Sequence, residues 1–151
     1  VQLQNMKDIP NSGMVSTVDI GHPVFIHPMD KETVGNRLAL WALAKTYGKK
    51  GFGYASPIYK SMEISDNKIY INVENAQRGL CPMWTALKGF EIAGEDKVFY
   101  PAKAWIERSK MLVKSERVPH PVAVRYGFVN YVEGDVYCDG LPLGSFRSDD
   151  W

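Results

Sequence analysis

The pattern of hydrophobic and polar positions changes sharply after about the first third of this chain. Within that third, the pattern predicts one short strand rich in β-branched residues, Met14–Val18, and one helix that begins near Met29. Apolar residues recur along the helix at Val34, Leu38 and Trp41. Steps of three and four positions place side chains on one face of a helix, so we expect this face to be buried.

The residues at both ends of the predicted helix agree with its direction. Asp30, Glu32 and Thr33 suit the positive N-terminal end of a helix, and Lys45 suits its C-terminal end. Gly48 follows as a suitable residue just beyond the end, because glycine readily adopts the left-handed conformation found there.

After "GKKGFGYASP" the pattern becomes a series of short alternating segments, among them "IYKSMEI", "KIYINVE" and "VAVRYGFVNYV". Turn signals such as Ser65-Asp66-Asn67 separate them. Strands at this regular short spacing favour an antiparallel sandwich or barrel. We therefore predict an α+β fold that is mainly β. A β–loop–α unit over residues 1–52 is followed by an antiparallel β-sandwich-like domain over residues 53–151.

The first unit looks incomplete, because a lone strand and helix cannot bury their own apolar faces. The helix face around Leu38 and Trp41 must therefore lie on the β unit, on another chain such as a second copy, or on a missing larger α/β sheet.

Composition limits the function classes. The chain has 151 residues, with 18 basic and 17 acidic residues and a net charge of +1. The charges are intermixed, so nothing predicts binding to nucleic acid or to an anionic membrane surface, and no apolar run is long enough to span a bilayer. Cys81 and Cys138 lack metal-ligand spacing, which leaves a disulfide, two free thiols and simple burial open.

The candidate chemistry lies in "TVDIGHPVFIHPMDKETVG", where His22 and His27 are each followed by proline. A loop between a strand and a helix is where catalytic groups collect in open α/β sheets. Proline restricts the backbone there, which would suit a general base held in place. The alternative is that the imidazole only packs, against Phe25 or Trp41.

Other groups give weaker signals. Asp19 could orient an imidazole, as the acid of a catalytic triad does, or it could form a turn. No nucleophile motif of the Gly-x-Ser-x-Gly type occurs. A metal site is not predicted, because His22 and His27 are not one helical turn apart and His120 stands alone between prolines.

The stretch "NSGMVSTVDIGHPVFIHPMDKETVGNRLALWALAKTYG" resembles the closing part of the catalytic domain of bacterial sialate O-acetylesterases, which are serine esterases of the SGNH-hydrolase type. "YKSMEI", "GFEIAGEDKVFYPAKAWI", "PVAVRYGFVNY" and "GLPLGSFRSDDW" resemble the β-rich C-terminal region of the same proteins. The resemblance implies that residues 1–52 are the last strand, the catalytic-His loop and the last helix of the esterase domain. Residues 53–151 would be an accessory domain.

In these esterases the His of "IHP" is the catalytic base, which corresponds to His27. Relatives commonly carry an acidic residue shortly before this His, where this chain has Val24 and Phe25. Asp19 could take its place, the site could work as a Ser–His dyad, or it could be impaired. The resemblance implies acetyl ester hydrolysis on a sugar, sialic acid above all, without a cofactor.

The resemblance also places the nucleophilic Ser upstream of Val1. We therefore expect the chain to be a C-terminal portion that is inactive alone, in a periplasmic or secreted protein. Its expected partners are an O-acetylated sugar and the missing catalytic segment, or a second copy, against Leu38 and Trp41. The rival hypothesis is a non-catalytic β module that packs on another domain or binds glycan through aromatic side chains, although aromatic residues in a sandwich usually form its core.

Overall fold

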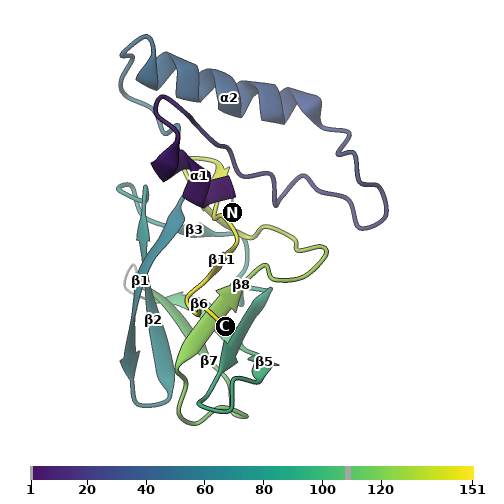
Figure 1. Ribbon diagram of the computed structural model, residues 1–151, viewed down its shortest axis with the longest axis vertical. Coiled ribbons are helices and arrows are strands. Elements are labelled where there is room, and N and C mark those ends of the chain that lie inside the picture. Colours follow the sequence, from purple (N-terminus) through teal and green to yellow (C-terminus); the bar gives the residue numbers. More distant parts are fainter. Residues whose placement is uncertain (1, 108–109) are drawn as a thin grey trace.

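The computed structural model describes residues 2–107 and 110–151. Two helices form one end of the molecule and the strands form the other (Figure 1). The helices in these ranges are α1 (Gln2–Asp8) and α2 (Lys31–Lys45). The strands are β1 (Ile58–Ser65), β2 (Lys68–Glu74), β3 (Cys81–Pro82), β4 (Phe90–Ala93), β5 (Phe99–Pro101), β6 (Lys103–Glu107), β7 (Lys110–Lys114), β8 (Ala123–Tyr126), β9 (Val136–Cys138), β10 (Leu141–Pro142) and β11 (Phe146–Arg147).

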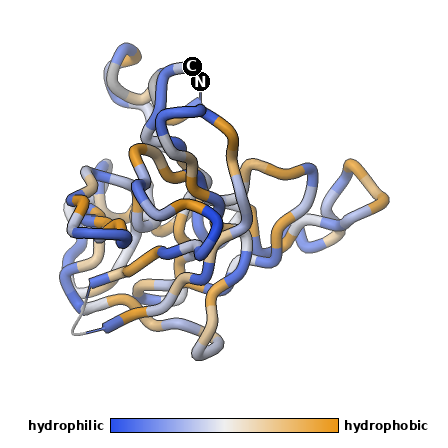
Figure 2. The backbone as a smooth tube through the Cα atoms, turned by 90° about the horizontal axis from the view of Figure 1, so that it is seen from below, coloured by the Kyte–Doolittle hydropathy of each residue, from blue (hydrophilic) through white to orange (hydrophobic). Residues whose placement is uncertain are grey.

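The strands form antiparallel sheets, as the alternating pattern predicts. One sheet has the order β1-β2-β7-β6, a second β11-β8-β4-β5, and a short third β10-β9-β3. Hydrophobic and hydrophilic stretches alternate along the backbone (Figure 2), and in β2 the buried positions are Ile69 and Ile71. Because successive side chains of a strand point to opposite faces, this alternation gives each sheet one face for the core.

The core lies between the two four-stranded sheets. Its side chains come from both of them and include Ile69, Ile71, Met111 and Val113 on one side and Phe90, Ile92, Val124, Tyr126 and Phe146 on the other. Burial of this apolar surface is the main favourable contribution to folding. The predicted fold class, α+β and mainly β with a sandwich-like domain, is confirmed.

The predicted helix is also confirmed and begins as its sequence indicates. The carboxylate of Asp30 accepts a hydrogen bond from the Thr33 amide at 2.9 Å, which satisfies one of the free N–H groups of the first turn. The chain leaves the helix near Gly48, whose φ of 63° is readily accessible to glycine.

The predicted strand over Met14–Val18 is not formed. Within the described residues this segment has no sheet partner and lies in irregular chain that leads into a turn at residues 18–19. A β-branched pattern shows that a segment can be a strand, but the strand forms only when a neighbour takes up its backbone hydrogen bonds. The pattern of one segment does not show whether a neighbouring strand is present.

Neither helix in the described part of the chain has the length and apolar character that crossing a membrane requires.

Candidate functional site

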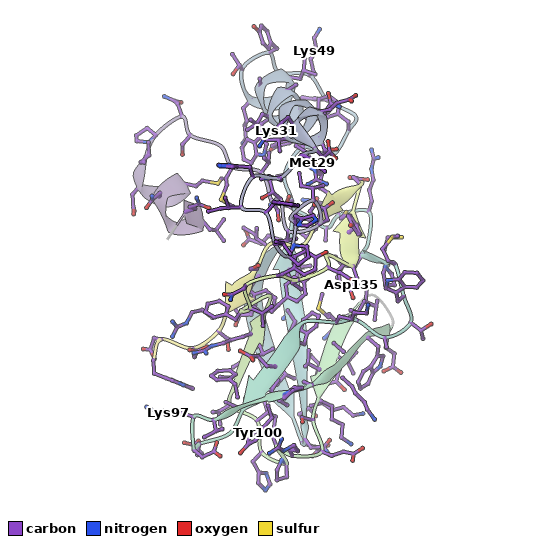
Figure 3. The ribbon with its side chains drawn as sticks, turned by 90° about the vertical axis from the view of Figure 1, so that its right-hand side faces the viewer. Met29, Lys31, Lys49, Lys97, Tyr100 and Asp135 are labelled. Carbon is purple, nitrogen blue, oxygen red and sulfur yellow. The ribbon has the colours of Figure 1, made fainter. Side chains whose placement is uncertain are left out.

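The loop that precedes α2 projects from the side of the molecule (Figure 1) and carries His27. His27 is exposed, and so are the large apolar side chains around it. Val24 is 79% exposed, Phe25 60%, Ile26 88% and Met29 83%. Figure 3 shows Met29 directly below the start of α2. Neighbouring apolar side chains exposed to this degree commonly mark a surface that another structure covers.

His22 has a defined role in the shape of this loop. Its Nδ1 accepts hydrogen bonds from the backbone amides of Val24 and Phe25, both at 3.1 Å. Its ring lies 4.8 Å from the ring of Phe25. Because Nδ1 is an acceptor here, a neutral His22 carries its hydrogen on Nε2. The packing against Phe25 that the sequence left open is therefore made by His22, and the imidazole of His27 stays exposed.

Asp19 forms a buried ion pair with Arg37 of α2. Its two carboxylate oxygens accept hydrogen bonds from Nη1 and Nη2 of Arg37 at 2.8 and 2.6 Å. The side chains of Arg37 and Asp19 are only 7% and 9% exposed. Arg37 Nη1 also donates to the backbone carbonyl of Ser16 at 2.8 Å. The Asp19 carboxylate is thus engaged by a guanidinium, and its predicted contact with an imidazole stays a hypothesis.

Arg37 was not predicted, and it determines which face of α2 points inward. The inward positions include Val34, Arg37, Leu40, Trp41 and Ala44, whereas Leu38 is 48% exposed. Within this inward stripe, Trp41 packs edge-on against Tyr54, with ring centroids 5.2 Å apart. A signal was available, since Val34, Arg37 and Trp41 recur at helical spacing, but a charged residue is rarely assigned to a buried stripe.

The β unit contacts this ion pair at the segment before β9. A Cβ atom built on Gly134 would lie 2.9 Å from Cβ of Asp19, so the two backbones meet where only glycine fits. The Tyr137 hydroxyl donates to the Gly134 carbonyl at 3.0 Å. Burial, with the neighbouring charge of Asp19, raises the pKa of Tyr137. The loop is therefore seated on the sandwich through Asp19.

Asp135, the next residue, is a buried acid that was not predicted as a site residue. It is 2% exposed and lies at the end of the sandwich that faces α2 (Figure 3). Its Oδ2 accepts the Lys88 amide at 2.7 Å, while Oδ1 has no partner among the described residues. Burial raises the pKa of this carboxyl. The buried Tyr126 hydroxyl also has no partner within the described chain, and burial with the charge of Asp135 raises its pKa.

A groove of about 360 Å³ separates the histidine loop from the segment after β8. It combines apolar and aromatic side chains with polar ones, which is the usual character of a small-ligand site. Its lining residues are Thr17, Val18, Gly21, His22, Phe25, Ile26, Pro28, Gly127, Val129, Asn130, Tyr131, Val132 and Ser145. The groove therefore lies on one side of the His27 loop.

The aromatic and cysteine residues of the β unit divide between core and surface. Phe90, Tyr126 and Phe146 are buried, whereas Trp84 is 60% and Phe128 45% exposed. Separately, Cys81 (exposed) and Cys138 (buried) are both free. No group of three or more His, Cys, Asp or Glu side chains in the described residues is arranged to hold a metal ion.

The chain is similar to a solved structure of a carbohydrate acetylesterase from Xanthomonas citri. The two share 35% sequence identity, and the structures superpose with a TM-score of 0.89. The match covers 99% of this chain and 35% of the other, so this chain spans about a third of the length of its structural relative. No protein-family model matches the sequence, and a comparison with curated proteins found no match.

Proposed function

We propose that this chain is the general-base-bearing portion of a carbohydrate O-acetylesterase and that His27 is the base. The observation that carries the proposal is the match to a carbohydrate acetylesterase at 35% identity over 99% of the chain. The position of His27 on a projecting loop agrees with it, because a base must reach a nucleophile and an ester that come from outside this loop.

In the complete site a serine hydroxyl attacks the acetyl carbonyl, and His27 accepts the proton of that hydroxyl. The tetrahedral intermediate collapses to an acetyl-serine, and His27 returns the proton to the departing sugar oxygen. Water then attacks the acetyl-serine by the same route and releases acetate. The reaction needs a nucleophile, a base and donors to the oxyanion.

The exposed apolar surface of the loop favours a covering segment that brings the serine. Val24, Phe25, Ile26 and Met29 flank His27 in the sequence, and their large side chains are open to water. Leu38, which is 48% exposed, adds apolar surface on α2. We propose that the segment with the nucleophile covers these side chains, and that the chain alone is inactive for this reason. A second copy at this surface is the alternative occupant.

The resemblance of the histidine stretch to bacterial sialate O-acetylesterases supports three finer parts of the proposal. These are that the sugar is a sialic acid, that the protein is of SGNH type and that it is periplasmic or secreted. An O-acetylated sialic acid and an acetylated neutral sugar, offered in parallel, separate the sialate-specific form of the proposal from the broader one.

A chimera tests the role of His27. The chain replaces the matching 35% of the Xanthomonas citri acetylesterase, and acetate release from an aryl acetate and from the two sugars is measured. We expect activity that His27→Ala abolishes and that the control variant His120→Ala retains in large part, because His120 is exposed and does not line the groove beside the histidine loop. Equal activity of the chimera with and without His27→Ala would refute the proposal. If the isolated chain hydrolyses the ester and this activity depends on His27, the proposal that the chain is inactive alone is refuted.

The binding module is the second candidate function, and exposed aromatic side chains favour it. Trp84 and Phe128 present rings to solvent at 60% and 45% exposure, and rings of this kind stack on sugar faces. It predicts saturable binding of a glycan by the isolated chain, measured calorimetrically. That binding would survive His27→Ala and fall in Phe128→Ala or Trp84→Ala.

A further inference from the structure

The buried ion pair joins the two ends of the histidine loop. Asp19 lies just before the loop, and Arg37 lies two turns into the helix that follows it. The bidentate contact between them, with the additional bond from Arg37 to the Ser16 carbonyl, holds both ends of residues 20–30 together. Arginine forms such two-pronged contacts with carboxylates in a fixed plane, so the pair sets orientation as well as distance.

The same carboxylate residue is the point where the loop rests on the sandwich. Gly134 approaches the backbone of Asp19 so closely that an added Cβ would lie 3.2 Å from its Cα and 3.2 Å from its N. The Tyr137 hydroxyl donates a hydrogen bond to the Gly134 carbonyl, and burial together with the charge of Asp19 raises its pKa. The contact is thus made by backbone and buried polar groups, which leave little room for adjustment.

We propose that Asp19, Arg37 and Gly134 are positioning residues for His27 and that the β-rich unit is the platform that holds the histidine loop in place. This inference rests on the proposed function only in naming His27 as the base. Asp19 then acts through Arg37 and the loop backbone, and a direct bond from its carboxylate to the imidazole is not required. The β-rich unit then contributes to catalysis by holding the histidine loop, without contacting the substrate.

The test introduces two independent disturbances and two matched controls. Asp19→Asn removes the charge of the pair, and Gly134→Ala inserts a methyl group against Asp19 without changing any charge. The backbone of Gly134 has a conformation that alanine also adopts, so the effect of Gly134→Ala is steric. Gly144→Ala is its control, since an added Cβ there meets only the Pro57 carbonyl at 3.8 Å.

Asp149→Asn is the control for the ion pair. Asp149 holds Arg125 of β8 with hydrogen bonds of 2.9 and 2.6 Å, the same bidentate arrangement with a buried carboxylate. Arg125 also lies over the ring of Phe99, 3.8 Å from its centroid. Neither Arg125 nor Asp149 lines the groove beside the histidine loop. We expect the loss of this pair to destabilise the fold without changing the order of the loop.

The first readout is the backbone order of residues 20–30 in the 151-residue chain, measured by NMR relaxation of the amides. We expect order parameters in this loop to fall in Asp19→Asn and Gly134→Ala, toward the range below about 0.6 that marks flexible backbone. They should stay at the native values in Asp149→Asn and Gly144→Ala. Unchanged loop order in Gly134→Ala, or an equal fall in the controls, would overturn the proposal.

The second readout is catalysis by the chimera described above. We expect kcat to fall by about 10- to 100-fold in Asp19→Asn and Gly134→Ala, with KM little changed, because a displaced base loses alignment rather than substrate binding. The controls should stay within about twofold of native kcat by the same argument. A chimera without activity would contradict the esterase proposal, while the NMR result would still decide the positioning role.

Discussion

Arg37 carries its charge into the interior because Asp19 and the Ser16 carbonyl meet it there. A buried ion pair is weak evidence for stability, since both groups lose their hydration. The consequence of removing one partner is much larger, because the other charge is then left buried and alone. The pair therefore contributes mainly geometry, which its place between the loop and α2 makes useful.

A double-mutant cycle tests this account of the pair. We expect Arg37→Met alone to lower the free energy of unfolding by about 3 kcal/mol, since it strands the Asp19 carboxylate. The double variant Arg37→Met with Asp19→Leu should recover most of that loss. Urea unfolding of the four proteins measures it, and additive effects of the two substitutions would contradict the account.

Asp135 gives the protein a specific pH dependence. Burial raises its pKa in the folded protein above the value in the unfolded chain. A carboxyl of this kind contributes stability that is fully present below the unfolded pKa, about 3.9, and that is lost as pH rises through the folded pKa. The buried carboxyl therefore lowers the free energy of unfolding at neutral pH.

Asp135→Asn should remove this destabilising effect, because the amide oxygen can still accept a hydrogen bond from the Lys88 N–H while the charge is gone. We expect the variant to be more stable than the native chain at pH 7 and to lose this advantage near pH 3.5. Urea midpoints at the two pH values measure the effect, and groups common to both proteins cancel in the difference. A difference that is the same at both pH values would be evidence against a raised pKa.

At the scale of elements, α2 shows what a hydrophobic pattern can predict. Its existence, a start near Met29 and an end before Gly48 were all predicted, and the helix has its N-cap at Asp30, because capping and helix signals are local. The buried face was only partly predicted. Leu38 and Trp41 were placed together, but the Asp19–Arg37 pair turns Trp41 inward and leaves Leu38 exposed. A long-range ion pair leaves no trace in local periodicity.

This orientation predicts unequal effects of two substitutions on α2. Leu38→Gln should change the free energy of unfolding of the 151-residue chain by less than about 0.5 kcal/mol, as exposed positions usually do. Trp41→Ala should cost about 2 kcal/mol, because it removes a half-buried ring that packs on Tyr54. Denaturant unfolding measures both, and a large loss in Leu38→Gln would mean that this residue is covered in solution.

The segment Met14–Val18 and the loop after it show the limit of local patterns at this scale. A strand was predicted from β-branched residues, yet the described chain offers it no neighbouring strand. The turn formed by His22 was not predicted either, since it depends on the imidazole accepting two backbone hydrogen bonds. Both features are decided by partners rather than by propensity.

At the scale of the whole molecule, the fold class could be predicted because alternation and turn signals are repeated many times in the β unit. The division into units over residues 1–52 and 53–151 stays a prediction. The contact of the histidine loop with the sandwich could not be predicted. It depends on the contact of Asp19 with Gly134 and Tyr137, which lie in a distant part of the sequence, and all three residues are of ordinary type. The resemblance to an esterase named His27, but the residues that hold its loop came only from the structure.

The most direct test of the central claim is kcat of the chimera with and without His27→Ala, measured as acetate released from an O-acetylated sugar. As the general base, His27 should be worth at least about 10³-fold in kcat, with the control variant His120→Ala losing far less. Loss of activity in His27→Ala at unchanged fold and substrate binding is the predicted result. A chimera that hydrolyses the ester equally well without His27 would contradict the claim.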